Sequence, residues 1–164
     1  MNELGVLLML WLLPLRSHPV SVGNSASIAP AAGRSEIAAL QEITDDLRTR
    51  LEISERVYVT LVDHNPLVMS VETLGGRVGP FVITVDRDFI SELGHDEIEA
   101  AIAHELGHVW IYTHHPYLQT ERHANEVAMR VINRSAFEPV YEKVWRRTGI
   151  PGNLVEFIGP GGQQ

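Results

Sequence analysis

The sequence contains no cysteine, and its acidic residues outnumber its basic ones. Without cysteine the chain cannot form disulfides, use a thiol nucleophile, ligate an iron–sulfur cluster or carry a lipidated N-terminal cysteine. The 13 Lys and Arg residues stand against 21 Asp and Glu, which gives a formal net charge of -8. Because nucleic acids and anionic membrane surfaces bind clustered positive charge, we expect no nucleic-acid partner. Any metal ion must be held by His, Asp or Glu.

The sequence also lacks an apolar run long enough to cross a bilayer. The longest run, Leu4–Leu15, has the length of the core of a secretory signal, and small and polar residues follow it. We therefore interpret residues 1–29 as a signal peptide or N-terminal leader and expect export to the periplasm or secretion. Membrane association is expected only if the leader is uncleaved. The alternatives are a membrane-anchored protein and, if the start is misassigned, a cytoplasmic one.

Residue patterns predict an α+β domain over residues 30–158, followed by a flexible tail at 159–164. A length of 164 residues with 45% hydrophobic content fits a single globular domain. Apolar residues recur at helical spacing from Ser35, a candidate N-cap, to Leu51. Three more helices are predicted in the second half of the chain, from about Asp96 to just before Pro116, and at about 118–135 and 138–148.

Strand patterns lie between the first helix and the second. The runs Arg56–Val62 and Leu67–Leu74 are rich in β-branched residues, and the turn sequence Asp-His-Asn-Pro separates them. This pattern predicts a hairpin. A third run, Phe81–Val85, follows Gly79 and Pro80, which suit the start of an edge strand. We expect a small, mainly antiparallel sheet.

The pentapeptide His-Glu-Leu-Gly-His at residues 104–108 lies inside the second predicted helix. Histidines four residues apart on a helix share one face, so His104 and His108 can grip one metal ion. Glu105 projects about 100° around the helix from His104, where its carboxylate can hold a water without becoming a ligand. We predict a zinc site with Glu105 as the catalytic base. The alternative is a coincidental match in a chain that has eight histidines.

A catalytic zinc ion has three protein ligands and an open position, so one ligand is still to be found. His114 follows His108 at the third-ligand spacing of the metzincin motif. That motif has a glycine where this chain has Ile111. If the helix continues through Ile111, His114 is rotated about 240° from His108 and points away from the metal.

Two glutamates of the next predicted helix are the other candidates. Glu121 shares its helical face with Ala124 and Ala128, whose small side chains let two helices approach closely. Glu126 lies about 140° from Glu121 around the helix, on a face that carries arginines. A solvated ion pair therefore suits Glu126 better.

The run from Phe81 to Val109, which leads through a strand into the His-Glu-Leu-Gly-His helix, resembles the core of HtpX-like gluzincin zinc metallopeptidases. The resemblance covers about 57–132 and fits a minimal, soluble form, because only twelve residues separate His108 from Glu121. In that family the third ligand opens a Glu-x-x-Ala-Asp sequence, which residues 121–125 match except for Asn125. The same residues are also similar to ImmA/IrrE-type metallopeptidases.

The resemblance implies a zincin-like fold, a minimal gluzincin in which the sheet packs on the active-site helix and on a following helix that bears Glu121. It implies that Glu121 is the third ligand and that Asn125 orients a metal-bound histidine. One Zn²⁺ per chain would then support hydrolysis of peptide bonds by Glu105-assisted attack of a zinc-bound water. The alternative is a non-catalytic zinc-binding regulatory or interaction protein with a peptidase-like fold.

Substrate binding and transition-state stabilisation are less specified by the sequence. A peptide or an unfolded protein is the expected substrate, bound by β-addition along the third strand at Phe81, Val82, Ile83, Thr84 and Val85. A side chain that donates a hydrogen bond to the tetrahedral oxyanion is usual in such enzymes. The sequence offers four candidates without choosing among them: His114, His115, Tyr117 and His123.

Overall fold

The structure, a computed structural model, describes residues 31–75 and 79–160. The leader predicted for residues 1–29 and most of the predicted tail lie outside the described residues. The elements are α1 (Ala31–Arg50), β1 (Val57–Val62), β2 (Met69–Thr73), β3 (Phe81–Asp86), α2 (Arg87–Ser91), α3 (His95–His114), α4 (Glu121–Ala128), α5 (Phe137–Thr148) and α6 (Leu154–Ile158). Short 3-10 turns occupy Pro116–Leu118 and Arg134–Ala136.

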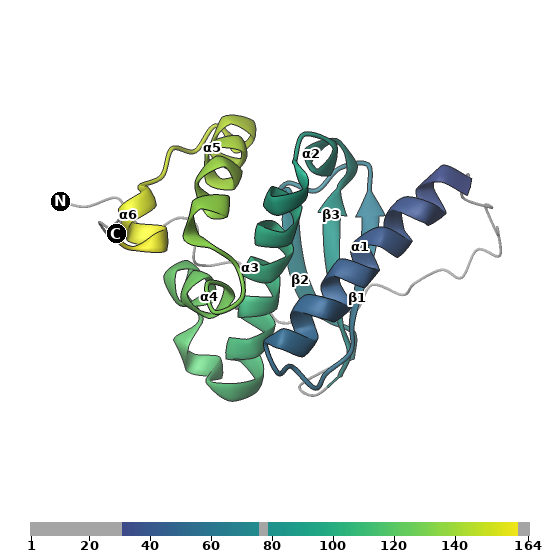
Figure 1. The fold of residues 1–164 in the computed structure, drawn as a ribbon, viewed down its shortest axis with the longest axis horizontal. Helices are drawn as coiled ribbons and strands as arrows, with labels where there is room; N and C mark the ends of the chain where they lie inside the picture. The colour runs from purple at the N-terminus through teal and green to yellow at the C-terminus, as the bar shows by residue number, and fades with distance from the viewer. Residues whose placement is uncertain (1–30, 76–78, 161–164) are drawn as a thin grey trace.

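The predicted α+β class is confirmed, with one three-stranded sheet and several helices. Helix α3 has the sheet on one side and α4 and α5 on the other (Figure 1). Helix α1 crosses the face of the sheet that α3 also covers. Alternate strand residues are buried, as expected for a sheet covered on one face. In the part of the chain that is described, no helix has both the length and the apolar character needed to cross a membrane.

The predicted hairpin is wrong, because β1 and β2 are not neighbours. The strand order is β1-β3-β2, with β1 parallel and β2 antiparallel to β3. The sheet is therefore mixed rather than mainly antiparallel. The sequence pattern placed Asn65 in a hairpin turn. Asn65 instead holds the connection between β1 and β2 against the end of β3. Its backbone N–H donates to Asp86 Oδ2 at 3.0 Å and its side-chain amide donates to the Thr84 carbonyl at 2.9 Å.

The prediction that Phe81–Val85 forms a substrate-binding edge strand is also wrong, because β3 is the central strand. Its hydrogen-bonding groups are engaged by neighbours on both sides, which leaves none for an added strand. Gly79 and Pro80 precede the strand, so the proline does not interrupt either ladder. The two edges of the sheet are instead the outer sides of β1 and β2.

The two edges differ in how they are covered. On β1, the Gln41 side chain of α1 donates to the Val57 carbonyl at 2.9 Å and accepts from the Val59 N–H at 3.0 Å. This pair of bonds occupies two of the positions that an added strand would use. On β2, the even-numbered residues make the backbone hydrogen bonds to β3, as the bond from Leu74 N–H to the Pro80 carbonyl shows. Val71 therefore directs its backbone N–H and carbonyl to the free edge.

The helices follow the sequence pattern in outline, with differences at α1, α2, α4 and α6. The helix predicted from about Asp96 to just before Pro116 is confirmed as α3, which ends at His114. The helix predicted for 118–135 is shorter, because α4 begins only after Thr120, whose side chain accepts from the His123 N–H, and ends at Ala128. Ser35 lies inside α1 rather than capping it, and neither α2 nor α6 was predicted.

Candidate metal centre

Helix α3 places the two histidines of the pentapeptide side by side. The ring centroids of His104 and His108 are 4.8 Å apart, and their Nε2 atoms are separated by 3.2 Å. Glu105 follows His104 and is buried, with 7% of its surface exposed. The arrangement arises because α3 packs between the sheet and α4, which buries both sides of the helix around the pentapeptide (Figure 1).

Glu121, the first residue of α4, faces the two histidines. One of its carboxylate oxygens lies 3.2 Å from His104 Nε2, and the other lies 3.5 Å from His108 Nε2. One ligand atom from each of the three residues lies within 4.8 Å of the others, a grouping that can hold a metal ion. The choice of Glu121 over His114 and Glu126 thus agrees with the geometry.

Close approach of α3 and α4 brings Glu121 to the histidines. Gly107 meets the main chain of α4 so closely that a Cβ added there would lie 2.3 Å from the Ala124 carbonyl oxygen. Ala124 and Ala128 are fully buried, as expected for small residues at a tight helix contact. The glycine of the pentapeptide therefore has a packing role that the sequence pattern did not indicate.

Each metal-facing histidine is also held at its other ring nitrogen by a carboxamide. His104 Nδ1 lies 2.9 Å from Asn125 Oδ1, and His108 Nδ1 lies 3.0 Å from Gln119 Oε1. In a neutral ring whose Nδ1 carries the proton, Nε2 has a lone pair that can bind a metal ion. The contact of Asn125 agrees with the role implied by the family resemblance. Gln119 was not identified from the sequence; its only signal was its position two residues before Glu121.

Burial and neighbouring charge act in opposite directions on the pKa values of His104 and Glu121. Burial lowers the pKa of His104, but the hydrogen bond and the charge of Glu121 outweigh it and raise that pKa to about 9. The two histidines hold the pKa of the Glu121 carboxyl far below its usual range, against the effect of burial. A metal ion that binds here would therefore compete with a proton on His104.

Glu105 has the opposite shift. Burial raises the pKa of its carboxyl, the negative charge of Glu121 acts in the same direction, and the charges of His104 and His108 oppose both. A carboxylate whose pKa is moved up towards neutrality accepts and returns protons more effectively near neutral pH. The direction of this shift suits a base, the role expected for Glu105 from the sequence.

Tyr141 of α5 is a further neighbour that the sequence did not indicate. Its hydroxyl accepts a hydrogen bond of 2.6 Å from Asn125 Nδ2, and its ring centroid lies 6.3 Å from that of His104. Helix α5 is held against α3 by the ion pair between Lys143 and Glu97, at 2.6 Å. The sequence pattern did not predict that α5 packs against α3, because the connection between α4 and α5 is irregular.

The remaining sequence candidates lie apart from the three ligands. The His114 ring stacks on Trp110 at 4.2 Å and its Nδ1 lies 2.9 Å from the Trp110 carbonyl. The prediction that Glu126 forms a helix ion pair is confirmed by its contacts with Arg122 and His123. Among the described contacts, the three ligands have no hydrogen bond to any of the four candidate oxyanion donors, which are His114, His115, Tyr117 and His123. Their role stays a prediction.

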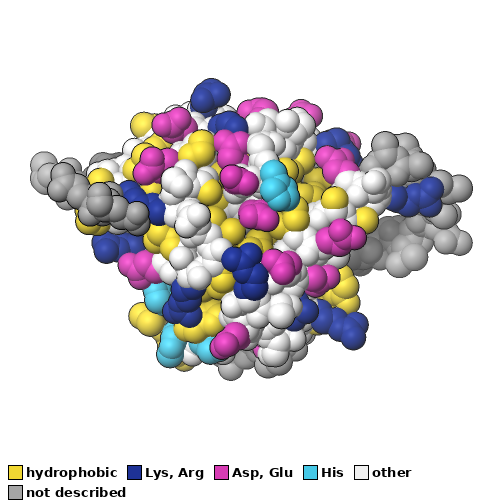
Figure 2. Space-filling view, in the orientation of Figure 1, with side chains coloured by type: hydrophobic (Ala, Val, Ile, Leu, Met, Phe, Trp, Pro, Cys, Tyr) yellow, Lys and Arg dark blue, Asp and Glu magenta, His cyan; other side chains and the backbone are white. Residues whose placement is uncertain are grey.

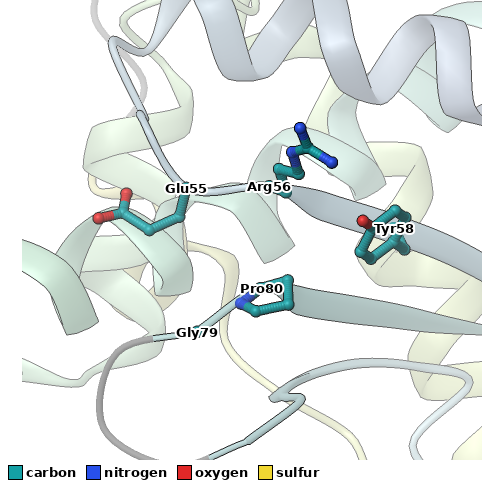
Figure 3. A pocket seen from close by; sticks show the side chains of 5 residues that line it. All are labelled: Glu55, Arg56, Tyr58, Gly79 and Pro80. Atoms are coloured by element: carbon teal, nitrogen blue, oxygen red, sulfur yellow. The ribbon is translucent and has the colours of Figure 1, made fainter.

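The surface of the protein also has a pocket that is separate from the metal-ligand cluster. The pocket at the starts of β1 and β3 is lined by Glu55, Arg56, Tyr58, Gly79 and Pro80 (Figure 3). It shares none of these residues with the metal-ligand cluster. Acidic and basic side chains are interspersed over the face shown in Figure 2.

In comparisons with protein-family models, curated proteins and solved structures, no match to this chain was found.

Proposed function

We propose that the protein is a zinc-dependent endopeptidase of zincin-like fold. The observation that carries the proposal is the grouping of the ligands: the Nε2 atoms of His104 and His108 are 3.2 Å apart, and each faces an oxygen of the Glu121 carboxylate, at 3.2 and 3.5 Å. Nitrogen and oxygen ligands roughly 2.0–2.1 Å from a tetrahedral zinc ion are about 3.3 Å apart. Three protein ligands, two of them imidazoles, also fit a catalytic zinc centre with one open position.

Different residues of the chain take different parts in the proposed hydrolysis. Zinc, when bound, would polarise the scissile carbonyl and lower the pKa of a coordinated water. Glu105 accepts the proton of the attacking water and then passes it to the leaving amine. His104, His108 and Glu121 hold the ion, and Asn125 orients the His104 ring. The Tyr141 hydroxyl accepts a hydrogen bond from Asn125 and so helps to hold the Asn125 side chain in place.

The free edge of β2 is the position that this structure favours for substrate. Helix α3 packs against the side of the sheet near β2 (Figure 1). Extended peptide backbone can add to the outward-facing N–H and carbonyl of Val71. Gln41 already occupies two of the outward-facing groups of β1, whereas no described side chain bonds to those of Val71. Recognition through backbone suits unfolded or flexible substrates.

A comparison of two glutamates of α4 tests the metal site. Glu121→Ala removes a ligand, so we expect zinc content to fall from about one ion per chain to a small fraction of that. Glu126→Ala is the matched control, since Glu126 pairs with Arg122 and His123 instead. Zinc is measured by elemental analysis after equilibrium dialysis. Equal zinc content in wild type and Glu121→Ala, or no zinc in wild type, would overturn the assignment.

A further inference from the structure

Gln119 makes two hydrogen bonds to the same residue, His108. Its Oε1 accepts from the His108 ring at Nδ1, at 3.0 Å, and its Nε2 donates to the His108 main-chain carbonyl at 3.1 Å. Gln119 lies in the short connection between α3 and α4, two residues before the ligand Glu121. The side chain thus reaches back from the start of one ligand-bearing helix to the ligand on the other.

The second of these bonds fixes the direction of the amide. A main-chain carbonyl can only accept, so the NH₂ group must face it and Oε1 must face the ring. Oε1 can only accept, so His108 Nδ1 must carry the proton. A neutral ring protonated at Nδ1 has its lone pair at Nε2, the atom that faces Glu121 and His104.

We propose that Gln119 is a positioning residue that sets the ring orientation and the Nδ1–H tautomer of His108 for metal binding. This inference rests on the proposed metal site. Asn125 provides a parallel on the other histidine: its Oδ1 faces His104 Nδ1 while its Nδ2 donates to the Phe157 carbonyl at 3.0 Å and to Tyr141. Both metal-facing rings are thus held by carboxamides whose donor ends are engaged elsewhere.

Two substitutions separate positioning from a structural link between the helices. Gln119→Ala removes both hydrogen bonds, and we expect zinc affinity to fall about 10- to 100-fold. Gln119→Glu keeps an acceptor for His108 Nδ1–H but loses the donor to the main-chain carbonyl. If the acceptor is what matters, the glutamate variant recovers most of the affinity that alanine loses, although both variants lose stability.

Gln41 provides a matched control. It makes the same kind of two-point amide contact, to the Val57 carbonyl and the Val59 N–H, at the β1 edge of the sheet. Gln41→Ala should lower the thermal midpoint without changing zinc affinity. This comparison distinguishes a general loss of stability from a specific loss of ligand geometry.

The experiment measures zinc affinity by competition with a chromophoric chelator, and the His108 tautomer by long-range ¹H–¹⁵N NMR of metal-free protein at a pH where the ring is neutral. We expect the Nδ1–H form in wild type and Gln119→Glu, and a mixture in Gln119→Ala. Wild-type affinity in Gln119→Ala, or equal losses in the alanine and glutamate variants, would overturn the proposal. If wild type binds no zinc, the proposed function fails, while the metal-free tautomer still decides the role of Gln119.

Discussion

Replacing Glu105 by glutamine is expected to lower peptide-bond cleavage by about 10²- to 10⁴-fold and to leave zinc bound. Glutamine has nearly the same shape as glutamate but cannot accept the proton of the attacking water. Glu105 is not one of the three grouped ligands, so metal affinity has no reason to fall with it. The measurement is the initial rate of casein cleavage by zinc-loaded enzyme, with zinc content determined on the same samples.

Glu99→Gln is the control for this substitution, because Glu99 lies on the same helix and pairs with His95 at the surface. It should cleave casein at the wild-type rate. Equal rates in wild type and Glu105→Gln would show that the observed proteolysis does not come from this site. Zinc binding without any cleavage by wild type would favour the alternative of a non-catalytic zinc protein.

Replacing Gly107 by alanine is expected to destabilise the protein and to weaken its zinc site together. The new Cβ would lie 2.3 Å from the Ala124 carbonyl oxygen and 2.9 Å from its carbonyl carbon. These are main-chain atoms, so α4 itself must shift. Overpacking of this kind costs about 1–3 kcal/mol and occasionally more. Because Glu121 lies one turn before Ala124, any displacement of α4 also moves the ligand.

Chemical unfolding of metal-free protein and zinc competition together measure both effects. Gly94→Ala is the control, since a Cβ there meets only the end of the flexible Glu97 side chain at 3.4 Å. It should leave zinc affinity unchanged. Wild-type stability and zinc affinity in Gly107→Ala would contradict the view that the α3–α4 contact positions the third ligand.

The pairing of His104 with His108 could be predicted from the sequence because its information is local, whereas the choice of Glu121 also rested on the family resemblance. The four-residue spacing of His104 and His108 determines that they share a helical face, whatever the rest of the fold does. Ile111 in place of glycine lets α3 continue and directs His114 away, as the structure has it. The small residues beside Glu121 indicated a close helix contact, although Gly107 on the opposing helix was not recognised as its counterpart.

The sheet order could not be predicted in the same way, because strand pairing depends on contacts between distant residues. A turn sequence between two β-branched runs favours a hairpin, yet here Asn65 bonds to Thr84 and Asp86, about twenty residues later. That attachment lets β3 insert between β1 and β2. Tyr141 was missed for the same reason, since its place beside Asn125 depends on how α5 packs against α3.

The most direct test of the account is casein cleavage by one preparation of the full chain before chelation, after removal of metal, and after zinc is restored. The proposed ligand set of His104, His108 and Glu121 predicts that cleavage is lost without metal and returns with about one equivalent of zinc per chain. Cleavage that persists in metal-free protein, or that zinc fails to restore in a folded chain, would contradict the account.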